Sequence, residues 1–393
     1  MSFLQEKIAQ AKLLLKEFSV DCWLTYVRET GLNGDPILPY LIDSDVTWHS
    51  AFIITARGES VAIVGSLERA AILDTHAYDR VEGYVKSFSD PFLAYLKELN
   101  PQSIAVNYSV ESEICDGLTH GMYLHLRELL ASIGMAERLC PAERIISALR
   151  QRKSSSEIAV MKEAIRRTLE IYEEVRAEIK PGISEKALAE FMQERVRAAG
   201  ATFAWDPGTC PSVFTGPETA GAHYGPTDRL VERGHVVNMD FGVKWEGYCS
   251  DLQRTYYIRR EGEVDAPEPV RRGFATIVRS IEAARSVLHP GVQGIAVDTA
   301  ARSILTTAGY EEFPHALGHQ VGRFAHDGTA LLAPAWEKYG AKPFEPIEEG
   351  MVFTIEPRLT VPGFGVVTIE EMVLVGARGA EYLSSPQKEL YVI

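Results

Sequence analysis

Two stretches in the second part of the chain share one layout, and this duplication constrains the possible folds more than any other feature. Pro181 and Pro290 each precede a glycine and a helix-patterned stretch, and in both copies a glycine ends that stretch nineteen residues after the proline. Further along, an apolar run ends in an acid in each copy, Asp240 in one and Glu356 in the other. Proline and glycine are also ordinary punctuation between elements. The repeated order nevertheless predicts two similar halves, each placing a carboxylate at the end of a buried strand.

The first part of the chain has a different pattern. Residues 1–150 alternate between helix-like and strand-like stretches, which predicts an α/β domain. The strand-like stretches include 51–55, 61–64 and 104–106. The run from Ser154 to Glu157 has the sequence of a helix start, so we place a domain boundary between residues 150 and 151. The prediction is a two-domain α/β (α+β) protein with domains at 1–150 and 151–393.

Charge and cysteine content exclude several classes of protein. The chain has 54 acidic and 40 basic residues, and its net charge of -14 repels phosphate backbones and anionic lipid, so neither nucleic acid nor membrane is an expected partner. The five cysteines are widely spread and form no CxxC pair, which argues against a disulfide framework or a thiolate zinc site. The first residues have the pattern of an amphipathic helix rather than a signal peptide, so we expect a cytoplasmic protein.

Asp240 and Asp251 are the first pair of candidate metal ligands. Apolar runs flank both, and the segment between them has the pattern of a β-hairpin whose turn we predict at Trp245 and Glu246. This register places the two acids directly opposite, with Cβ atoms about 4.5–5.5 Å apart. Opposed carboxylates destabilise a hairpin unless they are protonated or bridged by a cation, so the pattern favours a metal ion over a solvated acid.

The same arrangement recurs near the C-terminus. Glu356 and Glu370 are equidistant from a predicted turn at residues 362–364. A nitrogen donor often completes a transition-metal site. Three of the ten histidines, His315, His319 and His326, fall within twelve residues, and His319 is the best candidate ligand. A single histidine is usually a structural or surface residue, but this clustering favours function.

The motifs around these residues resemble the pita-bread metallopeptidases, a family that includes methionine aminopeptidase, aminopeptidase P and prolidase, with creatinase as a relative that does not use metal. The resemblance covers residues 151–393 and implies a pseudo-twofold catalytic domain. Residues 1–150 resemble the N-terminal domain of the aminopeptidase P, prolidase and creatinase branch. The motifs are Asn238-Met-Asp240-Phe-Gly, Gly247-Tyr-Cys-Ser-Asp251-Leu-Gln-Arg-Thr, His315-Ala-Leu-Gly-His319, Ala325-His326-Asp327, Thr354-Ile-Glu356-Pro and Ile369-Glu370-Glu.

The resemblance implies two divalent metal ions per subunit, with manganese expected first and cobalt or zinc as alternatives. It implies that Asp251 and Glu370 bridge the ions, that Asp240 completes one site, and that His319 and Glu356 complete the other. Two ions about 3.5–4 Å apart activate a shared water as hydroxide and polarise the scissile carbonyl.

Other residues match substrate-side positions of the family. His223, His315 and His326 match its substrate-binding histidines, and His223 and His326 are expected to take part in catalysis together with Glu356, which is implied to shuttle a proton. Many relatives have an arginine two residues before the last ligand, where this chain has Thr368. Arg358 is therefore a candidate for a relocated substrate-binding guanidinium, with a surface salt bridge as the alternative.

The branch resemblance implies cleavage of the Xaa-Pro bond at the N-terminus of dipeptides or short peptides, by a homodimer. Two alternatives remain: a creatinase-like hydrolase of a small guanidino or amide substrate, and a non-catalytic binding protein of the same fold. Retention of all five ligand residues argues against both. The long segment 28–49 also departs from relatives, and Trp48 or His49 within it are candidate substrate contacts, although loop and core roles are ordinary for such residues.

Overall fold

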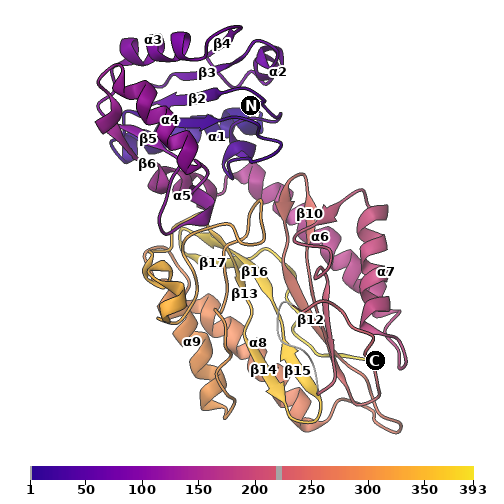
Figure 1. The fold of residues 1–393 in the computed structure, drawn as a ribbon. Helices are drawn as coiled ribbons and strands as arrows, with labels where there is room; N and C mark the ends of the chain where they lie inside the picture. The colour runs from indigo at the N-terminus through magenta and orange to yellow at the C-terminus, as the bar shows by residue number, and fades with distance from the viewer. Residues whose placement is uncertain (1, 218–223) are drawn as a thin grey trace. The chain divides into compact units, whose positions relative to one another are not determined.

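The computed structural model describes residues 2–217 and 224–393, and the chain forms two compact units, Met1–Arg150 and Gln151–Ile393. Within the described ranges, no helix has the length and apolar character needed to cross a bilayer. Figure 1 shows the elements of each unit.

The first unit is built on a six-stranded mixed sheet with the order β4-β3-β2-β1-β5-β6. The three predicted strands are confirmed as β2, β3 and β5. Helices α1 and α5 pack on one face of the sheet and α3 and α4 on the other, so both faces are covered and the central strands are buried throughout. The bounds are α1 Phe3–Glu17, β1 Cys22–Val27, β2 Ser50–Thr55, β3 Ser60–Gly65, α2 Arg69–Asp74, β4 Arg80–Tyr84, α3 Ser89–Leu99, β5 Ile104–Val106, α4 His120–Ala131, β6 Leu139–Pro141 and α5 Glu143–Gln151.

The second unit begins at the predicted helix start, where Ser154 and Glu157 form a capping box at the head of α6. Four helices pack against several short sheets (Figure 1). The bounds are α6 Ser155–Arg176, α7 Glu185–Ala198, β7 Thr202–Phe203, β8 Ser212–Thr215, β9 Val236–Phe241, β10 Val243–Trp245, β11 Tyr248–Cys249, β12 Leu252–Tyr257, α8 Glu268–Val287, α9 Gly294–Thr307, β13 Val352–Ile355, β14 Arg358–Val361, β15 Gly365–Thr368, β16 Glu371–Gly376, β17 Gly379–Tyr382 and β18 Tyr391–Val392.

The duplicated layout corresponds to two equivalent halves of this unit. Helices α7 and α9 each have 14 residues. The glycines that precede them make the same backbone contact, since Gly182 N–H donates to Val231 and Gly291 N–H donates to Ile347, both at 2.8 Å. Each half thus ties the start of its second helix to the segment that follows it.

The predicted register of the first hairpin is wrong by two residues. Trp245 pairs with Tyr248, so the turn consists of Glu246 and Gly247, and both adopt positive φ. Asp240 therefore lies opposite Gln253 rather than Asp251. A shift of two residues keeps a side chain on the same face of a sheet, so Asp251 becomes a diagonal neighbour of Asp240 instead of a direct one.

The predicted register of the second hairpin is confirmed. Ile355 pairs with Glu371 on one side of a break in the ladder, and Arg358 pairs with Thr368 on the other. Both sides share one register, in which Glu356 and Glu370 are equidistant from the turn, although both lie in the break and the bridge of Glu370 is with Gln253. The three-residue turn at 362–364 also lies where the sequence predicts it.

Candidate metal centre

Four of the five predicted ligands lie at or beside the end of a strand of the second unit, and the fifth, His319, lies outside the named strands. Asp240 is the penultimate residue of β9, Asp251 lies between β11 and β12, and Glu356 directly follows β13. His319 lies in a segment whose neighbours, Gly318 and Gln320, form isolated bridges to Leu332 and Phe353. Glu370 lies between β15 and β16. Residues from both halves of the duplication therefore contribute to one place.

The structure brings the side chains together around the imidazole of His319. Its Nε2 lies 3.5 Å from Glu356 Oε1, 3.7 Å from Asp251 Oδ2 and 4.0 Å from Glu370 Oε1. One donor atom from each of Asp251, His319 and Glu370 lies within 4.8 Å of the other two. The charge of Asp240 contributes to the raised pKa of Asp251, so Asp240 lies beside this group. The five side chains form what we call the carboxylate cluster.

The protonation chemistry of the carboxylate cluster fits a site for cations. Burial raises the pKa of Asp240 to about 7. Burial, followed by the charges of neighbouring acids in the cluster, raises the pKa values of Asp251, Glu356 and Glu370 well above those of free carboxyls. Asp240 Oδ1 and Glu370 Oε2 are buried and have no hydrogen-bond partner among the described residues. Divalent cations would supply the missing partners, and an oxygen-rich set with one imidazole suits several of them.

Gln253 connects the two halves at the cluster and was not identified from the sequence. Its backbone N–H and C=O exchange hydrogen bonds with those of Glu370, both at 3.3 Å. Its side-chain amide donates to Glu356 Oε2 at 3.3 Å. Gln253 lies two residues after Asp251, so strand alternation places it on the same face, and this spacing is a signal that the sequence contained.

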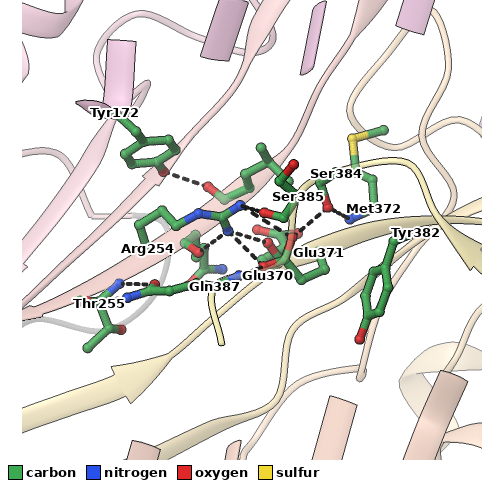
Figure 2. A network of polar contacts seen from close by, with 12 residues as sticks. Tyr172, Arg254, Thr255, Glu370, Glu371, Met372, Tyr382, Ser384, Ser385 and Gln387 are labelled. Atoms are coloured by element: carbon green, nitrogen blue, oxygen red, sulfur yellow. Dashed lines mark hydrogen bonds and ion pairs between the residues drawn. The ribbon is translucent and has the colours of Figure 1, made fainter. Parts of the chain in front are cut away.

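Behind Glu370, a buried ion pair between Arg254 and Glu371 supports the cluster (Figure 2). Arg254 Nη1 lies 3.0 Å from Glu371 Oε1, and both side chains are almost fully buried. Arg254 also donates to the carbonyl oxygens of Glu370 and Ser385, at 3.2 and 3.0 Å. Ser384 donates to the Glu371 carboxylate, as does the Gln387 backbone N–H at 2.8 Å. The network fixes the backbone from which the Glu370 side chain projects.

The predicted substrate-side histidines differ in where they lie. The ring of His326 meets that of His319 edge-on, with centroids 4.2 Å apart, so it lies beside the cluster. His315 Nδ1 lies 2.8 Å from the Ala316 carbonyl oxygen and must donate to it, which leaves Nε2 of the neutral ring as an acceptor. Burial lowers the pKa of His315 to about 4, so the ring is neutral at pH 7. His223 lies outside the described residues.

Comparison with known proteins identifies the family. Residues 159–377, more than half of the chain, match metallopeptidase family M24. The chain belongs to this family. Among M24 relatives, an uncharacterized peptidase of Staphylococcus saprophyticus is 28% identical over 386 residues, covering 97% of this chain and 100% of that protein. The probable dipeptidase PepE of Mycobacterium bovis is 29% identical over 380 residues, covering 93% of each chain.

Solved structures share the fold over the full length of the chain. The Xaa-Pro dipeptidase from Bacillus anthracis has a TM-score of 0.77 at 24% identity, covering 99% of this chain and 100% of its own. Dipeptidase PepE from Mycobacterium ulcerans has a TM-score of 0.72 at 26% identity, covering 100% and 98%. These likenesses confirm the predicted fold, an N-terminal α/β sheet followed by an M24 catalytic domain. M24 enzymes use divalent metal ions, and the cluster provides a buried Asp, His and Glu group of the required kind.

The raised pKa of Asp240 predicts how pH affects the M24 chain once metal is removed. A carboxyl whose folded pKa lies above its unfolded value of about 3.9 stabilises the fold below that value, and loses this contribution as pH rises through the folded pKa. For Asp240, with a folded pKa of about 7, the loss is on the order of 4 kcal/mol. The melting temperature of the chelator-treated protein should therefore fall between about pH 4 and about pH 7.

The Asp240→Asn variant is the control for this effect. It removes one titrating carboxyl and leaves histidines with lowered pKa values, such as His235 and His315, unchanged. Its melting temperature in chelator should depend less on pH than that of the parent protein. Equal pH dependence of the two proteins would contradict the burial of an uncompensated acid at position 240.

Proposed function

We propose that the chain is a dinuclear metal-dependent exopeptidase that cleaves the Xaa-Pro bond at the N-terminus of dipeptides or short peptides. The observation that carries the proposal is the convergence of three carboxylates, those of Asp251, Glu356 and Glu370, on the His319 imidazole in an M24 protein. Structural neighbours named as an Xaa-Pro dipeptidase and an X-Pro aminopeptidase support the choice of substrate. A proline imide has no N–H and a fixed φ, so its cleavage requires a pocket suited to a tertiary amide.

In the proposal, Asp251 and Glu370 would be shared by two divalent ions, Asp240 would complete the ligands of one, and His319 with Glu356 those of the other. When bound, such ions supply Lewis acidity and lower the pKa of water. Gln253 orients the Glu356 carboxylate through its amide. Manganese is the first expectation for the native ion, with cobalt and zinc as alternatives that the same donors accept.

The remaining groups act on substrate and protons. His326, whose ring lies beside that of His319, is assigned the donation of a hydrogen bond to the oxygen that becomes negative as the scissile carbonyl is attacked. His315 is neutral at pH 7 and offers Nε2 as an acceptor for a substrate N–H. Glu356 is assigned the transfer of a proton to the departing nitrogen. His223 is assigned to substrate binding and catalysis on its sequence motif alone.

The test is a matched set of substrates assayed with protein reconstituted with manganese, cobalt or zinc. Ala-Pro and an Ala-Pro-Yaa tripeptide should be hydrolysed, while Ala-Ala, a Met-initiated peptide and creatine should not. Chelator should abolish the activity, and added metal should restore it. Activity that survives complete metal removal, or equal hydrolysis of Ala-Ala and Ala-Pro, would contradict the proposal.

The family resemblance also implies a homodimer, which is part of the same proposal. Light scattering should then give twice the chain mass of 43.5 kDa. A single-chain mass at assay concentration, with full activity, would remove dimerisation from the proposal.

A further inference from the structure

Arg358 lies on the same face of its hairpin as the two glutamates of the carboxylate cluster. Arg358 pairs directly with Thr368, two residues from Glu356 and Glu370 on their respective strands. The alternate residues, including Leu359 and Val367, are buried in the hydrophobic core. Side chains alternate along a strand, so the residues between the core-facing ones, Arg358 among them, point to the opposite face, where the carboxylate cluster lies.

The guanidinium of Arg358 is partly buried but has no partner among the described residues. No hydrogen bond or ion pair involves its side chain within residues 2–217 and 224–393. Burial lowers the pKa of Arg358 without any opposing acid. Its charge in turn contributes to the lowered pKa of His315, so the two side chains lie near each other. A half-buried cation with no anion costs free energy, which an anionic ligand would offset.

We propose that Arg358 binds the C-terminal carboxylate of a dipeptide substrate. The inference rests on the proposed exopeptidase function and adds the substrate class, a dipeptide with a free carboxyl group. A guanidinium binds a carboxylate through two parallel hydrogen bonds, which gives both attraction and orientation. Arg358 therefore selects substrate by its length.

The spacing along the strand matches a dipeptide. Arg358 lies two residues, about 6.6 Å, beyond Glu356 along the hairpin. In a dipeptide the terminal carboxyl carbon is three bonds from the scissile carbonyl carbon, so the two are no more than about 4 Å apart. The long arginine side chain reaches this position beside the cluster. One additional residue would move the carboxylate about 3.8 Å further away and replace it there with a neutral amide.

The test compares free acids with amides in three proteins, all loaded with manganese. The parent protein should hydrolyse Ala-Pro with a kcat/KM about 10- to 100-fold above that for Ala-Pro-amide. Arg358→Met keeps the aliphatic stem. Its kcat/KM for Ala-Pro should fall to the value for Ala-Pro-amide, while the value for the amide changes little. Arg358→Lys keeps the charge without the bidentate geometry and should retain part of the preference.

Binding gives a readout that does not depend on turnover. Calorimetry should show proline binding to the parent protein more tightly than prolinamide, with the difference absent in Arg358→Met. A loss of activity on acid and amide by the same factor would overturn the inference and assign Arg358 to charge balance of the cluster. If no peptide is hydrolysed but proline binding depends on Arg358, the exopeptidase proposal fails while carboxylate recognition stands. If peptides are hydrolysed without any preference for the free acid, carboxylate recognition by Arg358 fails while the exopeptidase proposal stands.

Discussion

Glu370→Gln is expected to reduce kcat/KM for Ala-Pro by at least about 10³-fold, which corresponds to about 4 kcal/mol of transition-state stabilisation. In the proposed site this carboxylate bridges both ions, and an amide has neither the charge nor the second anionic oxygen needed to do so. Metal content, measured by mass spectrometry after dialysis, should fall below two ions per chain. Because the variant removes a buried carboxyl of raised pKa, its melting temperature in chelator at pH 8 should not decrease.

Glu381→Gln is the matched control, since Glu381 is an exposed residue of β17. It should retain full activity and metal content. Normal turnover by Glu370→Gln would exclude Glu370 as a metal ligand. A loss of activity together with a lower melting temperature in chelator would instead indicate a structural role for this carboxyl.

Arg254→Met should lower the free energy of unfolding by about 3–5 kcal/mol, because it leaves the Glu371 carboxylate buried without its cation. The substitution also removes three hydrogen bonds to backbone carbonyls, one of them that of Glu370. Urea denaturation in chelator measures the effect without a contribution from metal binding. With metal present, we expect weaker metal affinity as well, by about 10- to 100-fold, since Arg254 supports the backbone of a ligand.

Two variants test whether the lost stability comes from the unpaired acid. Arg378→Met, at an exposed position, should change stability by less than about 0.5 kcal/mol. Adding Glu371→Gln to Arg254→Met should recover part of the loss, because no charge remains buried. Equal stability of Arg254→Met and the parent protein would show that this ion pair contributes little to the fold.

The two hairpins show what the sequence could predict. The turn at 362–364 is marked by proline and glycine, and its register follows. In the first hairpin, the predicted turn at Trp245 and Glu246 would require positive φ at a tryptophan. The observed turn uses Glu246 and Gly247, which matches the preference of two-residue turns for glycine at the second position. The glycine at position 247 is therefore a stronger sequence signal for this turn than the symmetric spacing of the two acids.

Other parts of the site depend on contacts between distant segments. The bridge between Gln253 and Glu370 joins residues that are 117 positions apart, and the proximity of His315 to Arg358 comes from two segments of the second half. Local pattern identifies which residues face the core but not which segments meet. The duplication nevertheless predicted that each half would contribute a carboxylate, and the structure places Asp240 and Glu356 in one cluster.

The most direct test of the account is the position of metal in crystals of the manganese-loaded protein. Anomalous diffraction at the manganese edge should show two peaks about 3.5–4 Å apart. Both peaks should contact the carboxylates of Asp251 and Glu370, with His319 and Glu356 at one and Asp240 at the other. A manganese-loaded, active protein with a single peak, or with peaks away from these five side chains, would contradict the dinuclear site.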